Sequence, residues 1–101
     1  MSTVTTKEEV MQVLRDEMPL LRERYGITRI ALFGSFAQGS PREDSDVDIV
    51  VDASRPLGLK FFELSDYLAS RLGRMIDLLT FSMLKITKKK PEKYLGHLIY
   101  I

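Results

Sequence analysis

The sequence predicts an α/β fold in which helices pack against a sheet. Two stretches, residues 7–25 and 61–72, have apolar residues at helical spacing. Three mostly apolar segments of seven residues, 27–33, 46–52 and 75–81, have the length and composition of strands. Glycine, proline and other turn residues lie between these segments.

The first helix is expected to begin near Lys7 and to serve as a packing element. Thr6 and Glu9 have the spacing of a capping box, and Gly26 favours the left-handed conformation that ends helices. Pro19 lies inside this stretch. We expect it to kink or restart the helix, because proline removes a backbone hydrogen bond.

A Gly-Ser pair follows the first predicted strand. Gly34 is free in φ, and Ser35 can cap a short helical turn with its hydroxyl group. The unpaired N–H groups of such a turn converge on one spot, which phosphate commonly occupies. Taken alone, the pair also fits an ordinary strand-to-helix turn.

Two carboxylates occur in the second predicted strand. Asp46 and Asp48 are separated by one residue, so they are expected on one face of the strand while Val47 and Ile49 lie on the other. Two such acids repel each other unless a cation lies between them, and oxygen ligands with substrate phosphates suit Mg²⁺. The alternative is an exposed acidic pair on an edge strand. A phosphate-binding turn beside this pair indicates phosphoryl or nucleotidyl transfer.

A third carboxylate lies in the last predicted strand. The helix 61–72 ends at Gly73 and is expected to cross over the sheet to strand 75–81, whose only charged residue is Asp77. A strand, a crossover helix and a strand form a parallel unit, which places Asp77 beside the strand that carries Asp46 and Asp48. A buried, ion-paired acid is the alternative for this residue.

The C-terminal quarter carries weaker signals. Residues 85–93 are rich in lysine and are expected to form a solvated basic loop. Residues 91–97 are expected to form a short helix, and the apolar residues 98–101 to seek a partner.

Composition excludes several kinds of protein. With 101 residues the chain is expected to form one domain, 1–101, so a large acceptor must be bound partly by another chain. A net charge of +1 does not mark a nucleic-acid or membrane binder. The absence of cysteine excludes disulfides, zinc–thiolate sites and thiol nucleophiles, and His97 is the only histidine. No signal peptide or membrane-spanning run is evident, so we expect a cytoplasmic protein.

One combination of residues resembles the motif of the nucleotidyltransferase superfamily, which includes the polymerase β palm. The combination consists of Gly34-Ser35, the ten-residue gap that follows, Asp46-Val47-Asp48 and the later Asp77. The chain length and the helix-first order resemble its smallest branch, the minimal nucleotidyltransferases. The resemblance covers nearly the whole chain, from about residue 9 to residue 101.

This resemblance implies a mixed three-stranded sheet in the order 1-2-3, and a reaction in which AMP from ATP is transferred to a hydroxyl with two Mg²⁺ ions bound. Gly34 and Ser35 would hold the β- and γ-phosphates. Asp46 and Asp48 would bridge both metals. Asp77 would bind the catalytic metal and accept or orient the proton of the acceptor hydroxyl.

Some residues depart from the motif or have two interpretations. Many relatives carry arginine where this chain has Gln38, and Arg42 or a lysine at 88–90 could replace that phosphate contact. Phe36 and Tyr67 could stack on a base, but aromatic residues at such positions usually belong to the core. The acidic and hydroxyl residues beside the motif, namely Asp44, Ser45 and Asp52, are interpreted as loop and strand-end residues.

Minimal nucleotidyltransferases resemble antitoxins that adenylylate a tyrosine on a helical HEPN-type ribonuclease toxin. The resemblance therefore implies ATP and such a toxin as partners, in a hetero-oligomer or a homodimer, with no membrane and no direct nucleic-acid binding. Two alternatives remain. The chain could neutralise its partner by binding alone, or it could modify small molecules as antibiotic nucleotidyltransferases do, although those carry a further substrate domain.

Overall fold

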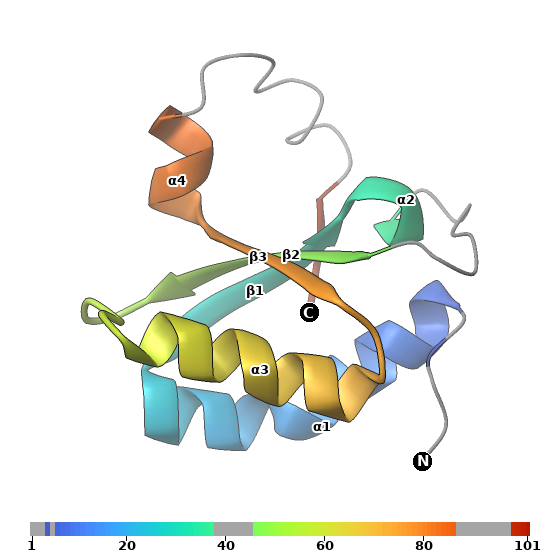
Figure 1. The fold of residues 1–101 in the computed structure, drawn as a ribbon, viewed down its shortest axis with the longest axis horizontal. Helices are drawn as coiled ribbons and strands as arrows, with labels where there is room; N and C mark the ends of the chain where they lie inside the picture. Colours follow the sequence, from blue (N-terminus) through green and yellow to red (C-terminus); the bar gives the residue numbers. More distant parts are fainter. Residues whose placement is uncertain (1–3, 5, 38–45, 87–97) are drawn as a thin grey trace.

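The computed structural model describes residues 4, 6–37, 46–86 and 98–101 (Figure 1). The elements, in chain order, are α1 (Lys7–Tyr25), β1 (Ile27–Phe33), α2 (Gly34–Ala37), β2 (Val47–Ala53), α3 (Lys60–Leu72), β3 (Ile76–Thr80), α4 (Phe81–Ile86) and β4 (Ile99–Tyr100). The strands form one sheet in the order β3-β2-β1-β4. β1 is antiparallel to β2 and β4, whereas β2 and β3 are parallel. The mixed α/β class is confirmed, and the predicted order 1-2-3 is extended by a fourth strand beside β1.

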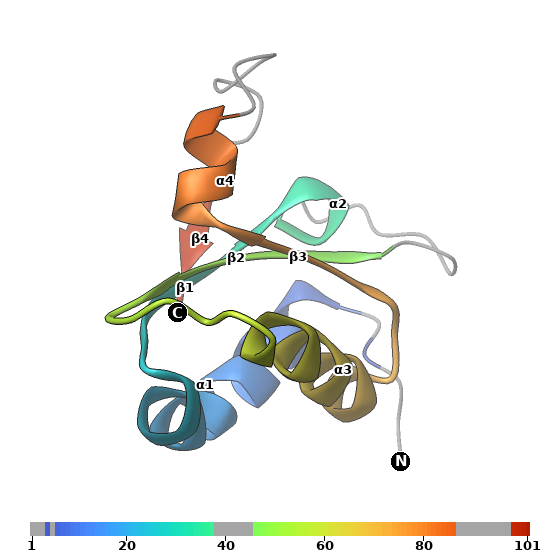
Figure 2. The same ribbon diagram turned by 60° about the vertical axis from the view of Figure 1, so that its left-hand side comes forward.

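α1 and α3 cover one face of the sheet, and α2 and α4 lie on the other, as Figures 1 and 2 show. We call the first the inner face and the second the outer face. The main core fills the space between the sheet and the two long helices. Its fully buried members include Leu14, Leu21, Ile30, Leu32, Val47, Ile49, Val51, Leu64, Leu68 and Leu72.

Strand alternation determines which side chains reach the outer face. Val47, Ile49 and Val51 belong to the core of the inner face, so Asp48 and Asp52 point the other way. A small second core of buried residues, Ala31, Phe33 and Val50, covers the middle of the outer face. The carboxylates of β2 therefore lie at the two ends of this apolar strip.

The capping of α1 is as predicted, but the effect of Pro19 is not. The Thr6 hydroxyl accepts a hydrogen bond from the Glu9 amide at 3.2 Å, the Glu9 carboxylate accepts one from the Thr6 amide at 3.1 Å, and Gly26 ends the helix with φ of 71°. The helix runs through Pro19 without interruption. Pro19 and Arg15 lie on the exposed side, where water can bind the carbonyl that the proline leaves unpaired.

Three predictions for the C-terminal half were wrong. Residues 75–81 were expected to form a buried strand, but β3 is an edge strand in which only Leu78 is buried, because its position in the sheet leaves one side open. The start of the expected basic loop belongs to α4. The apolar tail pairs with β1 of the same chain, and the Ile101 amide donates to the Ile30 carbonyl at 3.0 Å.

The helix expected at 91–97 and the lysines at 88–90 lie outside the described residues. Within the part that the structure describes, every helix is too short or too polar to cross a membrane.

Candidate active site

The site begins at Gly34, where β1 gives way to α2. Gly34 has φ of +75°, a conformation that side chains rarely adopt, so the predicted freedom in φ is used here. A Cβ atom added at this position would lie 1.9 Å from Oδ2 of Asp48. The carboxylate of Asp48 therefore lies directly against the backbone of Gly34. Ser35 is the second residue of α2, so the Gly-Ser pair opens a short helical turn as predicted, and phosphate binding at this turn stays a prediction.

The sheet register brings Asp48 and Asp77 side by side. Phe33, which precedes Gly34, is paired with Asp48 across the antiparallel ladder, and Asp48 is paired with Asp77 across the parallel one. Asp46 immediately precedes β2 and is exposed, whereas Asp48 is half-buried and Asp77 is exposed. The three predicted carboxylates and the Gly-Ser turn thus meet at one end of the outer face.

The charges at this end of the sheet repel one another. The pKa of Asp48 is raised from 3.8 to about 6, first by burial of its carboxyl group and then by the negative charge of Asp77, a hydrogen bond with Asp77 and the charge of Asp46. Each of these causes disfavours the ionised form. A cation bound here would remove the repulsion, which is the behaviour expected of a divalent-metal site.

The protein groups alone do not complete a metal shell. Among the residues that the structure describes, no three acidic, histidine or cysteine side chains lie close enough together to hold an ion. Mg²⁺ is usually held by one or two carboxylates together with substrate phosphates and water. Asp48 and Asp77, which are paired on adjacent strands, fit that arrangement.

Comparison with known proteins decides the family. The nucleotidyltransferase domain family matches residues 18–101 of this chain. The chain belongs to this family. It is therefore a nucleotidyltransferase. Asp48 and Asp77 lie on neighbouring strands, as predicted, whereas Asp46 immediately precedes β2 and was expected inside that strand.

Three relatives illustrate the similarity. The chain is 47% identical to the protein adenylyltransferase MntA of Thermococcus cleftensis over 81 residues, which cover 79% of this chain and 82% of that protein. A solved structure of a candidate minimal nucleotidyltransferase aligns with a TM-score of 0.70 at 29% identity, covering 97% of this chain and 98% of the other. A crystal structure of a toxin–antitoxin complex with AMP-PNP aligns with a TM-score of 0.63 at 26% identity, covering 95% of this chain and 72% of the other.

Three side chains for which the sequence left two interpretations, Phe36, Tyr67 and Asp52, make structural contacts, as predicted. Phe36 is fully buried, with the Arg74 guanidinium 5.1 Å from its ring centroid. The Tyr67 hydroxyl donates a hydrogen bond to the buried carboxylate of Glu17. Asp52 forms an ion pair with Arg29 at 3.1 Å. Several residues discussed for the sequence lie outside the described residues, namely Gln38, its candidate replacements Arg42 and the lysines at 88–90, Asp44, Ser45 and His97.

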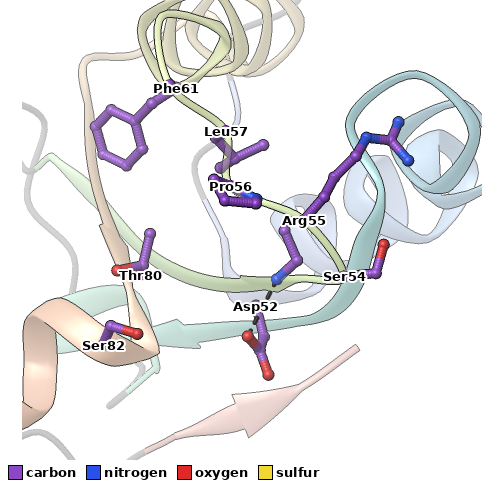
Figure 3. Close-up of a pocket in the computed structure, with 10 residues that line it drawn as sticks. Asp52, Ser54, Arg55, Pro56, Leu57, Phe61, Thr80 and Ser82 are labelled. Atoms are coloured by element: carbon purple, nitrogen blue, oxygen red, sulfur yellow. Dashed lines mark hydrogen bonds between the residues drawn. The ribbon is translucent and has the colours of Figure 1, made fainter.

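The far end of the same strands was not singled out from the sequence. A cavity of about 480 Å³ opens there, between the end of β2, the start of α3 and the end of β3 (Figure 3). It is lined by Asp52, Ala53, Ser54, Arg55, Pro56, Leu57, Gly58, Phe61, Thr80 and Ser82. Its residues lie at the end of β2 opposite to Asp48, so it is distinct from the site formed by Asp48 and Asp77. The sequence did indicate that Asp52 lies on the same face of the strand as Asp48, because the two residues are four positions apart.

Proposed function

We propose that this nucleotidyltransferase transfers AMP from ATP to a tyrosine hydroxyl of a HEPN-type toxin and thereby acts as an antitoxin. One observation carries the catalytic part of the proposal. Asp48 and Asp77 are side by side on adjacent parallel strands, and the Asp48 carboxylate rests against the backbone of Gly34 at the start of α2. Negative charge and a phosphate-binding turn therefore occupy one place, as nucleotidyl transfer requires.

Each residue then has a definite task. Gly34 and Ser35 hold the β- and γ-phosphates, for which the backbone at the start of α2 supplies N–H groups. Asp46 and Asp48 would hold the two Mg²⁺ ions. Asp77 would hold one of these ions and would accept or orient the proton of the attacking hydroxyl.

Bound Mg²⁺ would neutralise the charge that develops on the phosphate oxygens. The protein residues position the reactants. The Gly34 turn holds the leaving pyrophosphate, and Asp77, on the neighbouring edge strand, orients the attacking hydroxyl. Positioning of the reactants accounts for much of the rate enhancement in phosphoryl transfer.

The acceptor is proposed from the relatives. The Thermococcus cleftensis relative is named as a protein adenylyltransferase, and a solved relative is a toxin–antitoxin complex with AMP-PNP. These names support ATP as the nucleotide and a toxin protein as the acceptor. We infer that residues 1–101 act as one domain, in the cytoplasm, where ATP and Mg²⁺ are available.

The test is transfer of label from α-labelled ATP with Mg²⁺ to the HEPN-type protein encoded by the neighbouring gene, followed by intact-mass analysis of both chains. Asp48→Asn and Asp77→Asn are expected to reduce transfer by at least a hundredfold. Asp66→Asn, which removes an exposed carboxylate from α3, is the matched control and should transfer normally.

The alternatives predict different results. If the chain acts by binding alone, Asp48→Asn still neutralises the toxin and no AMP appears on any protein. If it modifies small molecules, label appears in a low-mass product while the partner keeps its mass. Loss of folding in both aspartate variants would contradict the assignment, because removal of a repelled carboxylate should not destabilise the fold.

A further inference from the structure

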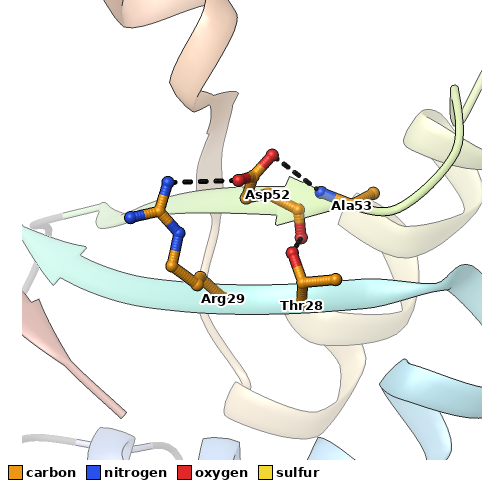
Figure 4. Close-up of polar contacts among 4 residues, drawn as sticks. All are labelled: Thr28, Arg29, Asp52 and Ala53. Atoms are coloured by element: carbon orange, nitrogen blue, oxygen red, sulfur yellow. Dashed lines mark hydrogen bonds and ion pairs between the residues drawn. The ribbon is translucent and has the colours of Figure 1, made fainter.

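A second cluster of charged and aromatic side chains lies on the outer face, at the far end of the strands that carry the catalytic acids. It consists of Arg29, Asp52, Phe81 and Tyr100, and we call it the outer-face cluster. Nη2 of Arg29 lies 3.1 Å from Oδ2 of Asp52 (Figure 4), and the guanidinium carbon lies 4.4 Å from the Phe81 ring centroid. The Phe81 and Tyr100 rings are stacked, with 6.2 Å between centroids and 5° between planes.

The cluster shares a face with the catalytic acids but does not touch them. Asp52 follows Asp48 by four residues on β2, and Phe81 follows Asp77 by four residues along β3 and the start of α4. At about 3.3 Å per strand residue, the two sites are roughly 13 Å apart. The buried strip of Ala31, Phe33 and Val50 lies between them. A polypeptide that presents a hydroxyl group at Asp77 can extend across this strip to the cluster.

The local backbone is built to present Arg29. The ladder between β1 and β2 has an irregularity between Ile27 and Arg29, which places Arg29 opposite Asp52 on the outer face. The Thr28 hydroxyl donates to the Asp52 carbonyl at 3.1 Å, and the Asp52 carboxylate accepts the Ala53 amide at 3.1 Å (Figure 4). These contacts hold the ion pair in one geometry before any partner arrives, which lowers the entropy lost on binding.

The cluster also has the composition of an interface centre. Arginine and tyrosine are enriched among residues that dominate binding free energy. The side chains of Arg29 and Asp52 are 52% and 43% exposed, and Tyr100 is 52% exposed. Within the described residues, Arg29 donates one hydrogen bond, to Asp52, so its remaining N–H groups can bind a carbonyl or carboxylate.

We propose that the outer-face cluster docks the polypeptide that carries the acceptor hydroxyl. Arg29 donates to a carbonyl or carboxylate of that partner, and the Phe81–Tyr100 stack packs against one of its apolar or aromatic side chains. The occupant is the acceptor protein because its hydroxyl must approach Asp77 over this same face. The inference rests on the proposed function in one respect, that the acceptor is a protein.

The test compares two surfaces of the chain 1–101. Arg29→Gln and Tyr100→Ser alter the outer-face cluster. Arg24→Gln and Phe62→Ser are matched controls on the helix layer, where Arg24 also forms an exposed ion pair and Phe62 is 65% exposed. Titration calorimetry would measure binding of the neighbouring-gene HEPN-type protein without nucleotide, and separately binding of AMP-PNP with Mg²⁺.

Each outer-face variant is expected to weaken binding of the partner at least tenfold and to leave AMP-PNP affinity within twofold of the wild type. The two controls should bind both ligands normally. Unchanged partner binding in Arg29→Gln and Tyr100→Ser, or equal weakening in the controls, would overturn the inference. Weakened AMP-PNP binding would overturn it too and assign the cluster to the nucleotide. Because partner binding is measured without transfer, a lack of AMP transfer in the wild type would refute the proposed function separately.

Discussion

Gly34→Ala should damage the site through Asp48. An alanine Cβ would lie 1.9 Å from Oδ2 of Asp48, whereas real Cβ atoms essentially never approach other atoms within 3.0 Å. The carboxylate must therefore move by about an ångström or the turn must open. A displacement of that size at a reacting centre can lower the rate about a hundredfold. The positive φ of 75° adds strain of about 1–2 kcal/mol to the folded state.

Gly58→Ala separates these two effects. Gly58 has φ of +56°, but an added Cβ there would meet no atom within 4 Å. Both variants should therefore lose about 1–2 kcal/mol in urea unfolding, since both place a side chain in the left-handed region. Only Gly34→Ala should lower AMP transfer, by about a hundredfold, and weaken binding of Mn²⁺. The reasoning is refuted if Gly34→Ala transfers AMP within twofold of the wild type, or if Gly58→Ala is equally impaired.

Three further predictions concern stability. Because the pKa of Asp48 is raised to about 6 in the folded state, its contribution to stability is complete below pH 3.8 and is lost as the pH rises through 6. Asp48→Asn should accordingly be more stable than the wild type at pH 7.5 without Mg²⁺, by about 1 kcal/mol after allowance for solvent screening. At pH 3.5 the two proteins should be equally stable. Urea titrations at the two pH values measure this, and a difference in stability that does not depend on pH would contradict it. Glu17 is 9% exposed and accepts hydrogen bonds from Tyr67 and Arg71, so Glu17→Ala should lower the unfolding free energy by about 2–3 kcal/mol. The exposed Arg24 pair is the comparison, and Arg24→Ala should change stability by less than about 1 kcal/mol in the same assay. Thr6→Ala removes the cap of α1 and should cost about 1 kcal/mol, with Thr6→Ser close to the wild type in thermal unfolding.

Local patterns were sufficient to predict that Asp48 and Asp77 lie on neighbouring strands. Alternation placed Asp48 on the face opposite to Val47 and Ile49, and the crossover rule placed β3 beside β2. Both arguments depend on a few neighbouring residues or on a connection whose handedness is nearly fixed. The capping box at Thr6 is equally local, since its partners are three residues apart.

Features that depend on distant parts of the chain were not predicted. The two-residue strand β4 has too few residues for a periodic signal, and its pairing with β1 is visible only in three dimensions. The ladder irregularity that places Arg29 opposite Asp52 leaves no mark in the sequence of β1. The prediction of a kink or restart at Pro19 was wrong because it considered only the lost hydrogen bond. The buried residues on the other side of α1 pack against the core and keep the helix continuous.

The inner face explains how the sheet can carry repelling carboxylates. Val47, Ile49 and Val51 are fully buried, and burial of such side chains contributes about 1.5–3 kcal/mol each. Burial of the Asp48 carboxyl group, together with repulsion from Asp77 and Asp46, opposes folding by about 1 kcal/mol once screening is allowed for. A slip of β2 by one residue would relieve the repulsion only by moving these three side chains to the outer face and the carboxylates into the core. Packing on one face thus fixes the register, and the fixed register keeps Asp48 and Asp77 together where a cation can join them.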